Sequence, residues 1–141
     1  MKSFRALSAL LIYPQPELVE ALDEIEATVE SEDLVSRAQM PGLRGLLDSL
    51  RGGDIYDLQE EYLLLFDRTR SLSLHLFEHV HGESRDRGQA LVDLKAVYED
   101  NGLMVDTREL PDFLPVFLEF LSMLPRDEAR AMLGETAHVL L

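Results

Sequence analysis

The sequence of 141 residues contains no cysteine. Disulfide bonds, thiolate metal sites and cysteine nucleophiles are therefore excluded. Its longest apolar stretch, around residues 113–124, is interrupted by Pro115, Glu119 and Ser122 and is too short to cross a bilayer. No small-residue cleavage site follows the apolar run at the start, so we interpret residues 1–13 as an amphipathic helix rather than a signal peptide. A cytoplasmic location is the default expectation.

Basic residues are scarce. The chain carries 27 Asp and Glu against 13 Lys and Arg, which gives a formal net charge of −14. Such a field repels nucleic acid and anionic lipid and attracts cationic partners at long range. The same acidity also maintains solubility, so the charge alone does not decide between a basic ligand and no ligand. With 46% hydrophobic residues, the chain is long enough to bury the core of one domain.

Apolar residues recur at helical spacing through most of the chain. Pro16 suits the first turn of one helix, and Asp54 suits the cap of another. A helix from Asp33 is expected to break at Pro41-Gly42, and a helix apolar nearly all round is expected to open at Pro111-Asp112. The inward-facing positions that we predict are Leu18, Leu22, Ile25, Val29, Leu43, Leu46, Leu47, Leu50, Ile55, Leu58, Tyr62, Leu65, Phe66, Ala90, Leu91, Leu94, Val97, Tyr98, Ala129, Met132, Leu133, Thr136 and Leu140.

This pattern predicts an all-α fold, a single-domain bundle of about seven to eight helices over residues 1–141. The segment from Ser71 to His81 is ambiguous, because its start alternates with period 2 while Leu72, Leu76 and Val80 share a helical face. A lone strand would leave its backbone groups unpaired, so we predict a helix. The chain ends at Leu141 in the middle of an apolar pattern, and we expect that it is truncated at this end.

The segment 66–93 is the one region of the sequence that is dense in both signs of charge. Three of the 4 histidines, His75, His79 and His81, lie close together in it, and Arg68, Arg70, Arg85 and Arg87 flank them. One interpretation is a metal site, since His75 and His79 at i and i+4 share a helical face and Glu78 could add a ligand. Acid–base catalysis by Glu78, His79 or Asp86 is a second, although no nucleophile elbow, phosphate loop or glycine fingerprint accompanies them.

A third interpretation is a recognition surface. Arginines offer forked donors to carboxylates and carbonyls, while histidines and Phe77 supply flat, partly apolar contact area. Such a mixed patch suits a peptide that binds against helices with apolar anchors and charged edges. An internal salt-bridge network that fixes helix packing stays open as an alternative, with capping roles for Asp67, Arg87 and Asp93. We favour a binding protein over an enzyme.

The run FEHVHGESRDRGQALVDL, preceded by LFDRTRSLSLHL and followed by ELPDFLPVFLEFLSMLP, closely resembles the nitrate reductase delta-subunit family. These are the NarJ-type assembly chaperones, relatives of the TorD-like redox-enzyme maturation proteins. The resemblance is sharp from about Leu58 to Pro125. It implies a TorD-like all-α bundle that has no catalytic activity and no cofactor of its own.

The resemblance also implies the partner. Family members bind the basic, amphipathic N-terminal peptide of the catalytic (alpha) subunit of respiratory nitrate reductase. They hold this apo subunit in the cytoplasm until its cofactors are inserted, before it docks on the membrane. No nucleic acid and no membrane insertion are expected. A monomer or a weak, domain-swapped dimer is expected, because TorD-like relatives can exchange helices.

Matched residue by residue, the family motif gives the candidate partner-binding site. Several relatives place a histidine where this chain has Phe113, and relatives extend well beyond the equivalent of Leu141, which puts one client contact in doubt. The alternatives that we keep are a metal-dependent hydrolase using His75, His79 and Glu78, and a permanent structural subunit of the reductase. The candidate residues are Phe66, Asp67, Arg68, Arg70, Phe77, Glu78, His79, His81, Glu83, Arg85, Asp86, Arg87, Gln89, Asp93, Glu109 and Asp112.

Overall fold

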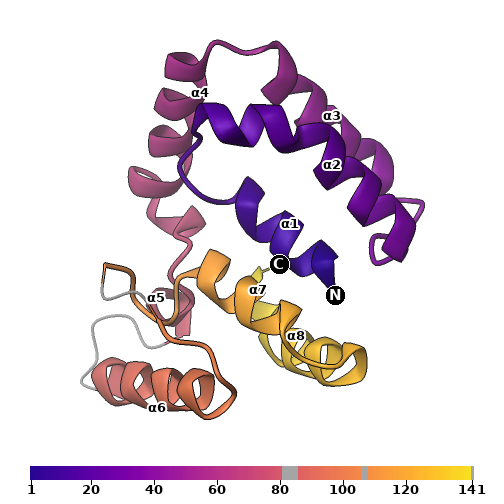
Figure 1. The fold of residues 1–141 in the computed structure, drawn as a ribbon. Helices are drawn as coiled ribbons and strands as arrows, with labels where there is room; N and C mark the ends of the chain where they lie inside the picture. Colours follow the sequence, from indigo (N-terminus) through magenta and orange to yellow (C-terminus); the bar gives the residue numbers. More distant parts are fainter. Residues whose placement is uncertain (81–85, 106–107, 141) are drawn as a thin grey trace.

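The computed structural model describes residues 1–80, 86–105 and 108–140, and Figure 1 shows how their helices are arranged. The described residues form eight α-helices and no strand, which confirms the predicted all-α class. In the part of the chain that is described, no helix combines the length and the apolar character needed to span a membrane.

The first two helices pack against each other. Helix α1 spans Lys2–Leu10 and α2 spans Pro16–Glu32, with Pro16 in its first turn and its predicted apolar stripe buried. The carboxylate of Glu32 accepts hydrogen bonds from the backbone N–H groups of Lys2 at 3.0 Å and Ser3 at 2.5 Å. The end of α2 therefore caps the free N–H groups of the first turn of α1.

Helix α3 spans Met40–Gly52, and the expected break at Pro41-Gly42 is wrong. Residues 33–39 form turns after Asp33 ends α2 in the left-handed conformation (φ 52°), and Pro41 lies in the first turn of α3. Proline is tolerated there because its missing N–H would have no helical acceptor. Leu46, which we predicted to face inward, is also exposed.

Helix α4 spans Ile55–Tyr62 and continues directly into a π-helical turn, η1, over Leu63–Asp67. The predicted cap is confirmed, because the Asp54 carboxylate accepts from the Tyr56 N–H at 2.9 Å. The wider π turn changes the register of the side chains. Leu65 is consequently 48% exposed, against the prediction, while Phe66 stays half-buried as predicted.

The predicted helix over Ser71 to His81 is wrong for its first half. A short 3-10 helix, η2, spans Arg70–Leu72, and α5 spans only Leu76–Val80. Between them, His75 pairs with Phe113 in an isolated antiparallel β-bridge, and the Leu114 N–H donates to the Leu74 carbonyl at 2.7 Å. The period-2 pattern therefore indicated an extended segment around His75. Its bridge partner, Phe113, lies in residues that we had predicted to be helical.

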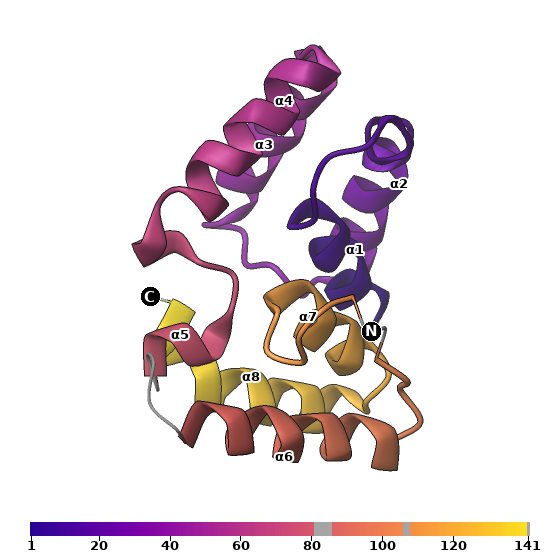
Figure 2. The ribbon, with the colours of Figure 1, turned by 90° about the vertical axis from the view of Figure 1, so that its left-hand side faces the viewer.

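Three further helices complete the fold: α6 (Asp86–Asp100), α7 (Leu114–Ser122) and α8 (Arg126–Leu140). Helix α7 begins at Leu114 rather than at Pro111, because Phe113 is extended. It contacts α1 and α8, so its predicted central position is confirmed. Figure 2 shows α6 at the end of the molecule opposite to α3 and α4.

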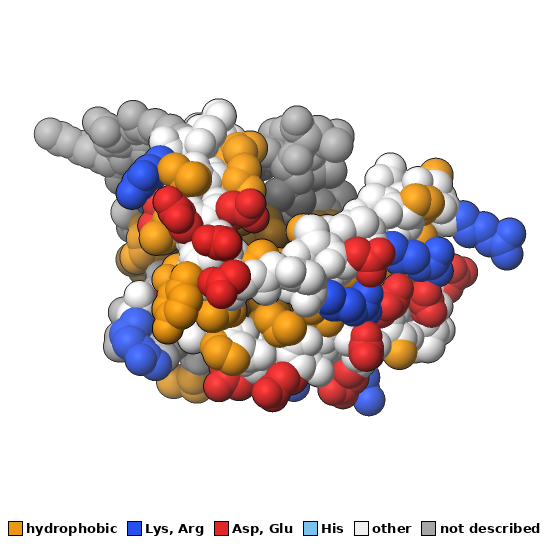
Figure 3. Space-filling model, turned by 90° about the horizontal axis from the view of Figure 1, so that it is seen from above, with side chains coloured by type: hydrophobic (Ala, Val, Ile, Leu, Met, Phe, Trp, Pro, Cys, Tyr) orange, Lys and Arg blue, Asp and Glu red, His pale blue; other side chains and the backbone are white. Residues whose placement is uncertain are grey.

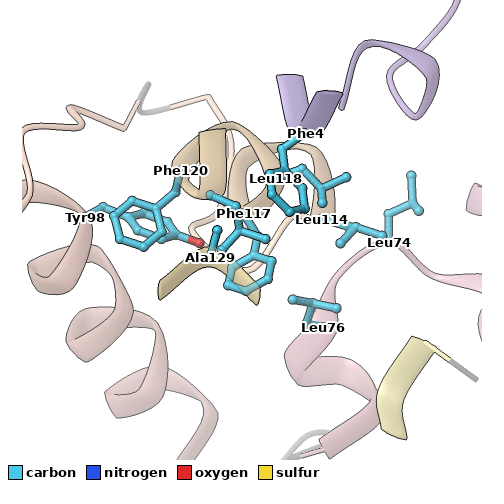
Figure 4. Close-up of a cluster of buried hydrophobic side chains, with 10 residues drawn as sticks. Phe4, Leu74, Leu76, Tyr98, Leu114, Phe117, Leu118, Phe120 and Ala129 are labelled. Atoms are coloured by element: carbon cyan, nitrogen blue, oxygen red, sulfur yellow. The ribbon is translucent and has the colours of Figure 1, made fainter. Parts of the chain in front are cut away.

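The core consists of two clusters. The smaller cluster lies between α1, α2 and α3, and the larger one is built around α7 (Figure 4). Tyr98 joins α6 to the larger cluster, and its hydroxyl donates to the Pro111 carbonyl at 2.8 Å. Val97 is exposed, against the prediction, because the buried face of α6 passes through Tyr98 and Leu94 instead.

Candidate partner-binding site

A small hollow of about 240 Å³ lies beside the start of the segment 66–93, and we call it the Phe66 pocket. It brings together residues from the turn after α1 and from η1, η2, α5 and α7 that are distant in the sequence. The Phe66 ring is packed on Tyr62, with ring centroids 5.0 Å apart. The lining residues are Leu11, Phe66, Ser71, Leu72, Ser73, Leu74, Leu76, His79 and Leu114, so two candidate site residues meet here.

Asp112 holds the backbone at the start of α5, which borders the Phe66 pocket. Its side chain is fully buried, and one carboxylate oxygen accepts the N–H of Phe77 at 3.0 Å, while its carbonyl accepts the N–H of Leu76 at 3.0 Å. The two bonds satisfy free N–H groups in the first turn of α5. Asp112 is therefore a positioning residue, whose contribution to the site passes through the backbone that it holds.

Part of the charged set pairs internally. Arg87 and Glu78 are both half-buried, and the Arg87 Nη2 lies 3.6 Å from a Glu78 oxygen, which links α6 to α5. The Gln89 amide donates to the Asp93 carboxylate at 2.8 Å, one turn along α6. These contacts match the packing role that the sequence left open for Arg87.

The other candidate residues differ in their surroundings. Asp67, Arg68, Asp86, Asp93 and Glu109 are exposed, and so is His79. Of Arg70 only the backbone is described, at the start of η2. His81, Glu83 and Arg85 lie outside the described residues. Which of the sixteen candidates contact a partner stays a prediction.

Two exposed carboxylates that are distant in the sequence, Asp67 and Glu109, both lie near Tyr62. Its pKa is raised to about 12, first by burial and then by the nearby charges of Asp67 and Glu109. Its hydroxyl donates to the Leu11 carbonyl at 2.8 Å and so ties the end of α4 to the residue that follows α1. The structure thus gathers negative charge around the junction of α1 with the segment 66–93.

The histidines do not adopt the arrangement required by the metal interpretation. His75 precedes α5, and its ring lies against Phe113 with centroids 5.2 Å apart. His79 instead places its Nε2 atom 2.8 Å from the Ser73 carbonyl oxygen. Over residues 1–80, 86–105 and 108–140, no three His, Cys, Asp or Glu side chains are grouped closely enough to hold a metal ion.

A larger hollow of about 450 Å³, which we call the α1–α7 groove, was missed by the sequence reasoning. Two carboxylates, Glu109 and Glu119, and the cation of Arg5 stand among its mainly apolar lining. The sequence feature that could have indicated this groove is the apolar run of residues 103–105, which follows Gly102 and lies outside any helix. The full lining is Arg5, Ser8, Ala9, Ile12, Leu103, Met104, Val105, Glu109, Phe113, Pro115, Val116 and Glu119.

The groove and the Phe66 pocket are neighbours. Leu11 lines the pocket and Ile12 the groove, and likewise Leu114 lines the pocket and Phe113 the groove. Met104 is 78% exposed at the groove, so its apolar side chain is open to a partner. Figure 3 shows a different face of the molecule, seen from above over α2, α3 and α4, where acidic and basic side chains stand among apolar ones. The groove and the pocket together can hold an apolar, positively charged ligand.

Comparison with known proteins gives a consistent assignment. Residues 16–140 match the family model for the nitrate reductase delta subunit. The chain is 46% identical over 134 residues to the nitrate reductase molybdenum cofactor assembly chaperone NarJ of Escherichia coli strain K12, covering 95% of this chain and 57% of NarJ. It is 44% identical over 140 residues to NarW of the same strain, a candidate chaperone of the same kind, covering 99% of this chain and 58% of NarW.

The fold has a solved counterpart. A candidate redox enzyme maturation protein from Archaeoglobus fulgidus superposes with a TM-score of 0.66 at 26% identity, over 99% of this chain and 82% of that one. The relatives are named as assembly chaperones and not as catalysts, which agrees with the prediction of a binding protein. The chain spans less than two thirds of the length of NarJ and NarW. It belongs to the nitrate reductase delta subunit family.

Proposed function

We propose that this chain acts as a chaperone in the assembly of respiratory nitrate reductase. It binds the N-terminal peptide of the apo catalytic subunit in the cytoplasm and holds that subunit until its cofactors are inserted, before it docks on the membrane. Membership of the family and the names of the relatives support the chaperone role. The observation that carries the peptide-binding step is the α1–α7 groove with its carboxylates.

The lining of the groove defines the kind of peptide that fits. Apolar side chains from α1, α7 and residues 103–105 form its surface, so one apolar face of a helical peptide is buried there. Glu109 and Glu119 stand among them and can pair with basic residues at the edge of that face. A basic amphipathic helix therefore satisfies both parts of the site.

The Phe66 pocket extends this surface. It is small and mainly apolar, so it takes a single apolar side chain of the peptide rather than a helical face. Asp67 and Glu109, which both raise the pKa of Tyr62, supply negative charge beside it. The net charge of −14 steers a basic peptide toward the chain at long range.

Calorimetric titration with the basic N-terminal peptide of the catalytic subunit tests the proposal. We expect saturable binding at low salt that weakens as salt is added, because the attraction is screened. Met104→Ser removes an exposed apolar contact in the groove, and we expect it to weaken binding about tenfold. Glu119→Gln is expected to raise Kd and to reduce the salt dependence.

Tyr56→Ser is the matched control, since Tyr56 is as exposed as Met104, at 77% against 78%, but lies on α4 and does not line the groove. It is expected to bind the peptide like the parent chain. Absence of binding at low salt would refute the peptide-binding step. Equal losses for Met104→Ser and Tyr56→Ser would show that the groove is not the site.

A further inference from the structure

A third hollow of about 410 Å³ lies at the junction between the turn after α2 and the first turns of α8, and we call it the arginine pocket. Arg37, Arg126 and Arg130 converge on it from segments that are almost ninety residues apart. A concentration of three cations is unexpected in a chain with 27 acidic and 13 basic residues. The lining residues are Asp33, Leu34, Ser36, Arg37, Arg126 and Arg130.

The two segments that carry these arginines are anchored in the core. Leu34 is packed against the larger hydrophobic cluster and anchors the turn that carries Arg37. Ala129 is fully buried in the same cluster and sets the orientation of α8. Arg126 and Arg130 are four residues apart on α8, so they lie on one face of that helix. The core therefore fixes the two backbone segments that carry the arginines, whose side chains are exposed to solvent.

The three guanidinium groups are not neutralised by the protein. Among the residues that the structure describes, none of the three has a carboxylate oxygen within 4.0 Å, whereas Arg44 and Arg51 on α3 pair with carboxylates of α2 at 2.6 and 2.7 Å. Asp33 is the one acidic residue in the lining, so the pocket keeps a surplus of two positive charges. Arginine is the side chain best suited to bidentate binding of oxyanions.

We propose that the arginine pocket binds the phosphoryl group of a small anionic ligand. A phosphate monoester carries about 1.5 to 2 negative charges at neutral pH, which matches the surplus, whereas a single carboxylate would leave one charge uncompensated. Leu34 is the sole apolar residue in the lining, so recognition rests on charge and hydrogen bonds. A basic peptide is repelled from this pocket, and the proposal is independent of the proposed function.

The test is a titration of the full chain with inorganic phosphate and with ribose 5-phosphate at low ionic strength, followed by the NMR signals of the backbone and of the arginine Nε–H groups. We expect saturable shifts confined to residues 33–37 and 125–130. Acetate is the comparison anion and is expected to bind at least about tenfold more weakly. Tighter binding of ribose 5-phosphate than of phosphate identifies an esterified ligand, and equal binding identifies the free anion.

Two variants on separate segments make the result decisive. Arg130→Gln and Arg37→Gln are each expected to weaken phosphate binding about tenfold, and because both side chains are exposed the fold is preserved. Lys95→Gln on α6 removes the same charge elsewhere and is expected to have no effect. Shifts spread over the surface, equal effects of Lys95→Gln, or acetate binding as tight as phosphate would each overturn the proposal.

Discussion

Replacement of Asp112 separates the positioning role of this residue from a role of its charge. Asp112→Ala removes the acceptor of the Phe77 N–H, whereas Asp112→Asn keeps an oxygen that can accept the same bond. The second carboxylate oxygen has no hydrogen-bond partner among the described residues, and an amide can occupy its place. The carbonyl of Asp112 still accepts from Leu76 in both variants, so α5 remains attached.

The magnitude follows from these contacts. A hydrogen bond to a charged group contributes about 1.5–3 kcal/mol, and loss of a helix cap costs about 1 kcal/mol. Removal of the buried oxygen without a partner offsets part of this loss. We therefore expect Asp112→Ala to lower the free energy of unfolding by about 1–2 kcal/mol, equivalent to about 3 °C in Tm per kcal/mol in a chain of this size. Asp112→Asn is expected to stay within about 1 kcal/mol of the parent chain.

Urea denaturation at pH 7 measures both variants, and hydrogen exchange of the Phe77 amide reports on the bond itself. We expect faster exchange of this amide in Asp112→Ala than in Asp112→Asn. If the two variants are equally destabilised, the negative charge matters rather than the cap. An unchanged stability and exchange rate in Asp112→Ala would refute the positioning role altogether.

Two further substitutions test the fold. Hydrogen bonding from Ser3 lowers the pKa of Glu32 below 4.5, so the carboxylate stabilises the protein above this pH and the contribution disappears as the pH falls through the lowered pKa. Glu32→Gln should therefore lower the free energy of unfolding, measured by urea denaturation, by about 0.5–2 kcal/mol at pH 7 and by much less at pH 3. An equal loss at both pH values would contradict the capping role of Glu32. Gly53→Ala should lower Tm, because a Cβ at this position comes within 2.7 Å of the buried Leu58 side chain. Gly52→Ala is the control and should not lower Tm, because its Cβ meets nothing within 4 Å. Equal Tm values for the two variants would refute this packing.

The helical class and the central position of α7 follow from apolar spacing alone, because a helix with apolar residues on nearly every side has to be enclosed. Local caps could also be predicted, as Asp54 shows, since the donor is two residues away. The extended segment at His75 could not, because its partner at Phe113 is distant in the sequence. The capping of α5 by Asp112 was missed for the same reason.

Which candidate residues contact a partner stays a prediction, but part of their arrangement could be expected from the sequence. The run 66–93 drew attention to Phe66 and His79, which do line one pocket. Charge density in the sequence could not separate Arg87, which pairs with Glu78, from exposed residues such as Arg68, because pairing depends on how α5 and α6 pack. The α1–α7 groove was missed because α1, α7 and residues 103–105 each contribute only a few apolar side chains to it.

The most direct test of the account is the location of the bound peptide. A spin label on the basic N-terminal peptide of the catalytic subunit broadens the NMR signals of nearby residues in the full chain. The account predicts broadening at residues 103–105, at Val116 and around Phe66, with little effect on the outer face of α2 and α3. Broadening centred on α2 and α3, with the α1–α7 groove unaffected, would contradict it.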